Sequence, residues 1–293
     1  MLATSIFALL ALVSPISSLS LPIINKNQQP LPDNDHNYLK SHFRGVEFKD
    51  LAAITTVFIE AFSPSAVWHY VMPGLQDHKD EAWACLHAEL KDAWRTRNTN
   101  RTIGKVITVP SRSNGHSESE QEAEAEEEDL VVSFSFWSIR TRKYGGDGEI
   151  EEPQEATNPL TSFSSLAAAL QSRCGGMAPG TNLTRAMDFQ RQNDAYEYKY
   201  FDKAYPHQLY LKLLATHPDW DGNGFGARHV EWGQQLSLEL EPRMPVTLFA
   251  SPAGYPLYDS LGFESVKNAT IAMLDGLGDL WFEVMRWEEV KEE

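Results

Sequence analysis

Cysteine and positive charge are both scarce in this chain. Its 293 residues include two cysteines, Cys85 and Cys174, which are too few for a disulfide-built scaffold or a cysteine-rich zinc site. Aspartate and glutamate together number 41 against 25 lysines and arginines, so the net charge is −16 at pH 7. Because such a surface repels phosphate backbones, nucleic acid is not an expected partner.

The sequence also lacks a long apolar run. A membrane-spanning helix needs about 20 consecutive apolar residues, and the apolar segment at residues 1–13 is shorter, so we expect no stable membrane anchor. Its length is typical of a secretory signal peptide with cleavage before Leu21, although no basic residue precedes it. Three Asn-X-Thr sequons would carry glycans in a secreted protein, and they begin at Asn100, Asn182 and Asn268.

Composition along the chain predicts one domain with two interruptions. Residues 1–20 are interpreted as a candidate signal peptide, residues 21–41 as a polar linker, and residues 42–290 as a single domain. Residues 110–129 are expected to form a disordered loop, because residues 118–129 hold eight acids and no base and leave the rest of the chain at −16 + 8 = −8. Residues 140–205 are interpreted as an insertion that either determines specificity or packs as a lid.

Hydrophobic periodicity predicts a mixture of strands and helices. Alternating or β-branched runs predict strands at residues 43–48, 103–109, 130–139, 209–216, 246–250, 264–267, 271–274 and 280–287. Stripes with a 3.6-residue period predict helices at residues 51–62, 80–94, 186–200 and 228–240. Asp50 is the candidate cap of the first helix, and residues 68–70 are expected in a loop. This order predicts an α/β fold.

The most informative stretch is residues 209–263. An apolar strand leads through the turn HPDW (217–220) into the sequence DGNGFGA (221–227), and a helical pattern follows. The first amides of a helix have no partner inside the helix and carry partial positive charge. Glycines let these amides approach a phosphate closely. Gly222, Gly224 and Gly226 are therefore expected to cradle an anion such as a pyrophosphate.

Two familiar nucleotide loops fit this stretch poorly. A P-loop requires Gly-Lys-Ser/Thr after its glycines, whereas Ala227 and Arg228 follow here. The dinucleotide motif G-x-G-x-x-G/A is matched by Gly222, Gly224 and Ala227, but that loop should follow its strand directly, and the next strand should end in an acidic residue. Here a turn intervenes and the next strand ends at Ser251, so we reject the P-loop and keep the dinucleotide loop only as a disfavoured alternative.

The stretch resembles the GNAT-type N-acetyltransferase superfamily, especially its fungal members. The loop motif of that family, Q/R-x-x-G-x-G/A after a strand and a His-Pro-type turn, matches residues 221–226 at the glycines. Its later motif, small residues and then Leu-Tyr and Gly-Phe, matches residues 250–263. The resemblance implies a three-layer α/β fold with a twisted mixed sheet of about seven strands and helices on both faces. It also implies that the parallel strands at 209–216 and 246–250 splay apart to admit acetyl-CoA as co-substrate.

The resemblance further implies how the cofactor would bind. Backbone groups left unpaired on the splayed strand would bind the pantetheine arm, and the loop amides would bind the pyrophosphate. The family begins its loop motif with Gln or Arg, whereas this chain has Asp221. At 4 Å and an effective dielectric constant near 20, the repulsion of a phosphate charge is about 4 kcal/mol, so Asp221 is expected to turn away and cap the helix. The implied cofactor-binding residues are Leu214, Ala215, Thr216, Asp221, Gly222, Asn223, Gly224, Phe225, Gly226, Ala227 and Ser251.

Catalysis in this family is direct attack of a neutral amine on the thioester in a ternary complex. A backbone N–H of the splayed strand would stabilise the developing oxyanion. Tyr258, in the Leu-Tyr pair, would protonate the departing thiolate, and the alternative is a core tyrosine with a satisfied hydroxyl group. An alkyl amine, with a pKa of about 10.4, also needs a base. The family often places a glutamate on the strand before the loop, but this chain has LKLL at 211–214. No base is therefore assigned, and water or His69, Glu60 or Asp202 stay open as candidates.

The sequence therefore predicts an N-acetyltransferase for an amine of a small molecule or peptide. Two alternatives stay open, an O-acyltransferase and a secreted glycoprotein that keeps the fold without catalysis. The apolar N-terminus favours the secretory pathway or an extracellular location, whereas acetyl-CoA use favours the cytoplasm. No metal ligands are expected.

Overall fold

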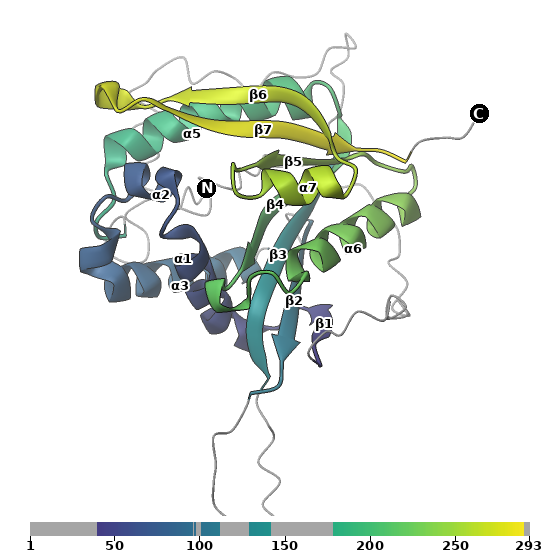
Figure 1. Cartoon of the computed structure of the whole chain (residues 1–293), viewed down its shortest axis with the longest axis horizontal. Helices are drawn as coiled ribbons and strands as arrows, with labels where there is room; N and C mark the ends of the chain where they lie inside the picture. The colour runs from purple at the N-terminus through teal and green to yellow at the C-terminus, as the bar shows by residue number, and fades with distance from the viewer. Residues whose placement is uncertain (1–39, 96, 98–100, 112–128, 142–177, 290–293) are drawn as a thin grey trace, which may run out of the picture.

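The structure, a computed structural model, describes residues 40–95, 97, 101–111, 129–141 and 178–289. The candidate signal peptide, most of the linker, most of the acidic loop and residues 142–177 of the insertion lie outside this range. The described chain forms a seven-stranded sheet in the order β1-β2-β3-β4-β5-β7-β6 (Figure 1). The strands are β1 (His42–Gly45), β2 (Thr102–Val109), β3 (Leu130–Thr141), β4 (His207–Thr216), β5 (Val246–Ala250), β6 (Glu264–Ala272) and β7 (Asp279–Trp287).

The sheet is mixed, because β4 and β5 run parallel while every other neighbouring pair is antiparallel. One face carries α1 (Leu51–Phe62), α2 (Ala66–Val71), α3 (Lys79–Arg95), α5 (Leu183–Glu197) and the π-helical turn η3 (Tyr198–Asp202). The other face carries α6 (Phe225–Glu239) and α7 (Tyr255–Ser260). The predicted three-layer α/β architecture with seven strands is therefore confirmed. Single 3₁₀ turns complete the fold at η1 (Phe48–Asp50), η2 (Leu75–His78), η4 (Pro218–Trp220) and η5 (Leu274–Gly276).

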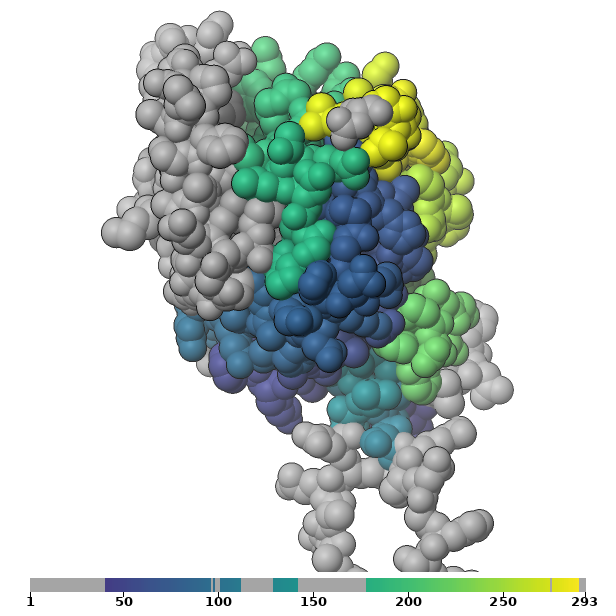
Figure 2. Space-filling view, turned by 90° about the vertical axis from the view of Figure 1, so that its left-hand side faces the viewer, coloured from purple at the N-terminus to yellow at the C-terminus, as the bar shows by residue number. Residues whose placement is uncertain are grey.

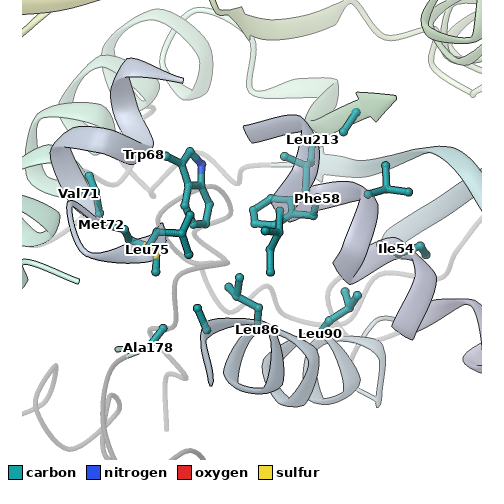
Figure 3. Close-up of a cluster of buried hydrophobic side chains, with 14 of the residues drawn as sticks. Ile54, Phe58, Trp68, Val71, Met72, Leu75, Leu86, Leu90, Ala178 and Leu213 are labelled. Atoms are coloured by element: carbon teal, nitrogen blue, oxygen red, sulfur yellow. The ribbon is translucent and has the colours of Figure 1, made fainter. Parts of the chain in front are cut away.

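A large apolar core lies between the sheet and α1, α2, α3 and α5. Figure 3 shows Phe58 of α1 between Trp68 of α2 and Leu86 of α3, with Leu213 of β4 nearby. Phe58 is fully buried, and its ring meets that of Trp68 edge-on at 5.2 Å. Such packing explains why the apolar stripes predicted for residues 51–62 and 80–94 form helices on this face.

A second core lies between the sheet and α6. Val230, Trp232 and Leu236 of α6 pack on Leu209 and other β-strand residues. Gly233 is required here, because a Cβ at this position would lie 2.1 Å from the indole of Trp137. The helix therefore approaches the sheet more closely than any side chain at residue 233 would allow.

Several local predictions differ from the structure. Residues 68–70 are helical rather than in a loop, because Ser65 accepts a hydrogen bond from the backbone N–H of Trp68 and starts α2. The first strand ends at Gly45, before the predicted residue 48. Asp50 stands at the start of α1, but its carboxylate binds Arg44 and the N–H of Glu47 instead of capping α1. Residues 264–272 form one strand rather than two.

The hairpin and the helix predicted around the interruptions are confirmed. Strands β2 and β3 pair antiparallel on either side of the acidic loop, and α5 with η3 covers the predicted helical segment 186–200. Cys85 is fully buried in α3 and is disulfide-bonded, while Cys174 lies outside the described residues. Among the residues described, no helix is both long and apolar enough to cross a membrane.

Candidate active site at the splayed strands

The parallel strands β4 and β5 separate soon after they meet. They pair only at Leu209 with Val246 and at Tyr210 with Thr247, although β4 continues to Thr216 and β5 to Ala250. A buried hydrogen bond from the Thr247 hydroxyl to the Gln208 side chain joins the two strands at this vertex. Beyond the vertex, the edge of β4 that faces β5 has no strand partner in the described chain. The predicted splay is therefore present, and Figure 1 shows the two strands diverging.

A β-bulge marks the same place on β4. Phe136 of β3 pairs with Leu213, while the next residue, Trp137, pairs with Leu211, so Lys212 is the extra residue. On either side of the bulge, Leu211 belongs to the α6 core and Leu213 to the α1 core. A bulge adds local twist and redirects side chains, which helps to turn β4 away from β5.

The glycine loop, residues 221–227, joins β4 to α6 through η4. Gly222 and Gly224 have φ angles of 79° and 73°, a left-handed conformation that favours glycine over any residue with a Cβ. Gly224 is the N-cap of α6 and provides no side-chain cap. Within the described chain, the backbone amides of residues 222–227 donate to no protein acceptor. This row of unpaired amides at a helix N-terminus is suited to bind an anion.

The loop is held by side-chain contacts that do not involve these amides. Phe225 is buried and packs near Trp220, with ring centroids 6.5 Å apart. The Asn223 side chain donates to the carbonyl of Trp220 at 2.9 Å, and His217 Nδ1 accepts from the N–H of Asp219 at 3.2 Å. His217 therefore has a structural role in the turn. These contacts pre-form the loop without using its amides.

The expectation that Asp221 caps α6 is wrong. The capping position is held by Gly224, three residues later. Asp221 is exposed at the end of η4, where its own N–H donates to the Pro218 carbonyl at 3.2 Å. The turn at Gly222 separates its side chain from the first turn of the helix. Its negative charge thus stands at the entrance of the loop.

The other strand of the splay ends in a short turn that starts α7. Ser251 follows β5, and its hydroxyl accepts a hydrogen bond from the N–H of Gly254 at 3.1 Å. Tyr258 of α7 is buried, and its ring meets Phe263 edge-on at 5.7 Å. Burial raises the pKa of the Tyr258 phenol, so the hydroxyl keeps its proton at neutral pH. A protonated phenol can donate a proton, and the raised pKa makes Tyr258 a weaker acid than an exposed tyrosine.

A charged cluster, which we call the Arg140 cluster, lies on the face opposite α6. It consists of Arg140 of β3, Glu197 of α5, Asp202 of η3, and Tyr210 and Lys212 of β4. Arg140 forms ion pairs with Glu197 and, at 3.5 Å, with Asp202. Its guanidinium also lies 3.7 Å from the ring centroid of Tyr210. Because all these partners except Lys212 are buried, their interactions are weakly screened by water.

The turn η3 brings this cluster to the vertex of the splay. Phe201 of η3 contacts Tyr210 of β4 at 5.5 Å and Phe249 of β5 at 4.8 Å between ring centroids. One aromatic side chain therefore touches both strands where they part. Turns of π-helix often occur at functional sites. Figure 2 shows one face of the molecule, with α5 in green above α2 and α3 in blue.

Burial shifts the ionisation of several groups near the cluster. The pKa of Asp194 rises to about 7, because burial and then the neighbouring Glu197 outweigh a hydrogen bond from Gln190. Burial and Glu197 also raise the pKa of Tyr210 well above its usual value, while Arg140 opposes them. The pKa of Lys212 falls to about 8, mainly through burial and secondly through Arg140. Perturbed groups of this kind gather at functional sites more often than elsewhere.

Of the three candidate bases named from the sequence, the structure brings only Asp202 to the cluster. His69 is exposed on α2, and Glu60 forms an ion pair with Lys79 at 2.6 Å. Sequence reasoning missed Arg140, Glu197 and Lys212 as site residues. A charge inside a strand that is otherwise apolar was the available signal for both Arg140 and Lys212.

No protein-family model matches this chain, and no curated protein matches it. Several solved structures are similar at low identity. A mosquito arylalkylamine N-acetyltransferase like 5b is 12% identical, covers 84% of this chain and 99% of its own, and gives a TM-score of 0.47. The PaiA N-acetyltransferase from Thermoplasma acidophilum, crystallised in complex with coenzyme A, is 9% identical over 86% of this chain and 100% of its own, with a TM-score of 0.43.

A third structure, NAA60 from Arabidopsis thaliana in complex with acetyl-CoA, is 12% identical over 84% of this chain and 97% of its own, with a TM-score of 0.42. Identities and scores at this level say nothing of what this chain binds or catalyses. None of these three proteins comes from a fungus, so they lend no support to the narrower resemblance to fungal members.

Proposed function

We propose that this protein is an acyltransferase that moves an acetyl group from acetyl-CoA to an amine of a small molecule or peptide. The observation that carries the proposal is the splay of β4 from β5 beside the unpaired amides of residues 222–227. Unpaired backbone groups are costly unless a ligand or water satisfies them. A long ligand with an amide-bearing arm and a pyrophosphate would satisfy both sets at once.

The residues present fit such a ligand. The edge of β4 from Leu214 to Thr216 would pair with the amide groups of the pantetheine arm. The amides of the glycine loop would hold the pyrophosphate, and nothing lies within 4 Å of where a Cβ of Gly222 would stand. The bound thioester would supply the activated acetyl group. A backbone N–H of β4 would stabilise negative charge that develops on its oxygen.

Tyr258 would donate the proton that the thiolate needs on departure. It belongs to α7, which directly follows the open end of β5. The phenol is protonated at neutral pH, as this role requires, and its position in the Leu-Tyr pair is the reason for assigning it. The acceptor is defined only as an amine, because the glycine loop and the splayed strands would contact the cofactor and not the acceptor.

The first experiment is calorimetric titration of the purified protein with acetyl-CoA. We expect saturable binding in the wild type and weaker binding in Gly222→Ala. Gly276→Ala is the matched control, because Gly276 also has a positive φ, 68°, and open space at its Cβ, but lies in η5. Both variants carry similar backbone strain, about 1–2 kcal/mol, so only a ligand at the loop separates them. No binding at millimolar acetyl-CoA would refute the proposal.

The second experiment tests for transfer. Release of free thiol from acetyl-CoA is followed with spermidine, glucosamine, tryptamine and a lysine-containing peptide as acceptors. An O-acyltransferase would instead respond to alcohols, and these are included as a separate panel. Binding of acetyl-CoA without transfer to any acceptor would favour a protein that keeps the fold without catalysis.

A second candidate is a secreted glycoprotein without catalysis, and two features of the chain bear on it. Cys85 is disulfide-bonded, and disulfides persist mainly in oxidising compartments. Asn268, the start of a sequon, is exposed on β6, and the Thr270 hydroxyl contacts its side-chain oxygen at 3.4 Å. Loss of mass on glycosidase treatment of protein from its native host would support this candidate, and an unglycosylated product would remove it.

A further inference from the structure

The Lys212 amine stands at a distinctive place in the fold. Lys212 is the extra residue of the bulge in β4, two positions beyond Tyr210, where β4 last pairs with β5. It is therefore the first polar side chain on β4 past the vertex of the splay. It is half-buried, so it is partly desolvated while still open to exchange of protons.

The charges around Lys212 come from three elements. Arg140 of β3 and Glu197 of α5 act on it directly, with opposite signs. Asp202 of η3 pairs with Arg140, and Asp194 lies close enough to Glu197 for the two to interact. Within the described residues, Glu197 is the anion that acts directly on Lys212, and it stabilises the protonated form of the amine.

These surroundings make the amine a poised proton acceptor. Burial first and Arg140 second lower the pKa of Lys212 to about 8, against the opposing effect of Glu197. A substantial fraction of the amine is then neutral near pH 7.5, unlike an exposed lysine with a pKa of about 10.4. A base with a pKa near the working pH is present in its unprotonated form to a useful extent and is still basic enough to take a proton.

We propose that Lys212 is the general base of this site, taking a proton from an ammonium acceptor that enters on the side of α5 and η3. The inference rests on the acetyltransfer proposed above. The Nζ lone pair of Lys212 binds one proton of R–NH₃⁺, leaving R–NH₂ and a Lys212 ammonium stabilised by Glu197.

The neutral R–NH₂ then forms the C–N bond to the acetyl carbonyl carbon while the C–S bond breaks. The thiolate takes its proton from Tyr258, which recovers one from the nitrogen of the new amide. Lys212 returns the first proton to solvent. The balance is R–NH₃⁺ plus thioester giving amide, thiol and H⁺.

Two substitutions separate proton transfer from simple charge. Lys212→Met removes the amine, whereas Lys212→Arg keeps a positive charge that does not deprotonate near neutral pH. With the best acceptor of the amine panel at pH 7.5, we expect both to lower kcat by about 100-fold, the lower end of general-base effects. The Kd for acetyl-CoA should stay within about twofold, and the loss should shrink as pH approaches the pKa of the acceptor. Lys203→Met, at an exposed lysine just after η3, is the matched control and should behave as wild type.

A second readout does not depend on turnover. The lysines are reductively methylated with ¹³C-formaldehyde, and each dimethyl-lysine signal is followed by NMR from pH 6 to 11. The signal of Lys212 is identified as the one that is absent from the spectrum of Lys212→Arg. An apparent pKa near 8 for Lys212, distinct from that of Lys203, is expected. A value near 10, wild-type turnover in Lys212→Arg, or stoichiometric acetylation of Lys212 by acetyl-CoA alone would overturn the inference. Failure of the wild type to bind acetyl-CoA would overturn the proposed function with it, whereas normal turnover in Lys212→Met would overturn the inference alone.

Discussion

The two sides of the splay present different chemical groups: backbone amides on one side and side chains on the other. One side consists of the end of β4 and the glycine loop, residues 214–227, which are contiguous in the sequence. It offers backbone amides and contains two glycines in the left-handed conformation. The side that faces α5 and η3 uses charged and aromatic side chains from β3, α5, η3 and β4. One side is thus defined by local backbone conformation and the other by tertiary contacts.

Under the proposed function, this difference would separate recognition of the cofactor from recognition of the acceptor. A pyrophosphate and an amide-bearing arm are the same in every acetyl-CoA molecule, and backbone groups are enough to bind them. An acceptor amine must be positioned and deprotonated, which requires side chains with adjusted pKa values. Substitutions on the two sides should accordingly have separable effects on cofactor affinity, turnover and stability.

The largest expected effect is on stability, at Arg140. Arg140→Met leaves the buried Glu197 without the cation that it pairs with and removes an ion pair from Asp202, so the free energy of unfolding should fall by about 3–5 kcal/mol. Arg286→Met removes an arginine from an exposed ion pair with Glu264 and should cost less than about 1 kcal/mol. Chemical denaturation of both proteins checks the difference. Equal losses would mean that the Arg140 cluster is not a buried, interdependent unit.

Next in size is the effect of removing the Tyr258 hydroxyl. Tyr258→Phe should lower kcat by about 100-fold, as expected when a positioned acid is lost, and leave the Kd for acetyl-CoA nearly unchanged. Tyr255→Phe, in the same short helix α7, is the control. Steady-state kinetics and calorimetry separate the two quantities. Equal turnover in wild type and Tyr258→Phe would show that Tyr258 is only a core residue.

A smaller effect is expected from pH on the α6 side. Burial, and secondly Arg228 and Lys105, lower the pKa of His229 to about 3, and its Nδ1 is hydrogen-bonded to the Ser135 hydroxyl at 2.8 Å. The unfolded chain binds a proton at His229 below its ordinary pKa of about 6.5, whereas the folded chain does not. The contribution of His229 to stability is therefore complete above pH 6.5 and is lost progressively as pH falls toward 3.

His229→Phe should remove this part of the acid sensitivity. Between pH 6.5 and 5, the wild type should lose about 2 kcal/mol more than the variant, since each pH unit is worth about 1.4 kcal/mol. Denaturation curves at several pH values measure the difference, with His207→Phe as the exposed control. Parallel pH profiles for the wild type and His229→Phe would mean that the imidazole is protonated in the folded state.

The smallest expected effect concerns Asp221, at the entrance of the glycine loop. Asp221→Gln removes a negative charge near the proposed pyrophosphate, so acetyl-CoA should bind about fivefold more tightly, equivalent to about 1 kcal/mol for an exposed charge. The gain should shrink at high salt. Asp219→Asn makes the same charge change in η4, two residues away. Unchanged affinity in Asp221→Gln would mean that this side chain points away from the ligand.

The strands, the helices and the glycine loop were predictable because their signals are local. The apolar periods of β4 and α6, and the glycines between them, depend only on neighbouring residues. Segment 68–70 was mispredicted because a single cap, the hydroxyl of Ser65, starts a helix too short to show a periodic pattern. The capping role expected of Asp221 failed for a related reason, since the turn at Gly222 moves the start of α6 to Gly224.

The amino-acid sequence by itself determined an α/β fold, the order of its strands and longer helices, and a glycine loop at residues 221–227 that is suited to bind an anion. Only the tertiary structure decided that Arg140, Glu197, Asp202 and Lys212 meet where β4 and β5 part. The physical reason is that a charged residue within an apolar strand does not predict which residues will pair with it. Burial makes such a charge unfavourable alone, and the fold satisfies it with groups that lie far away along the chain.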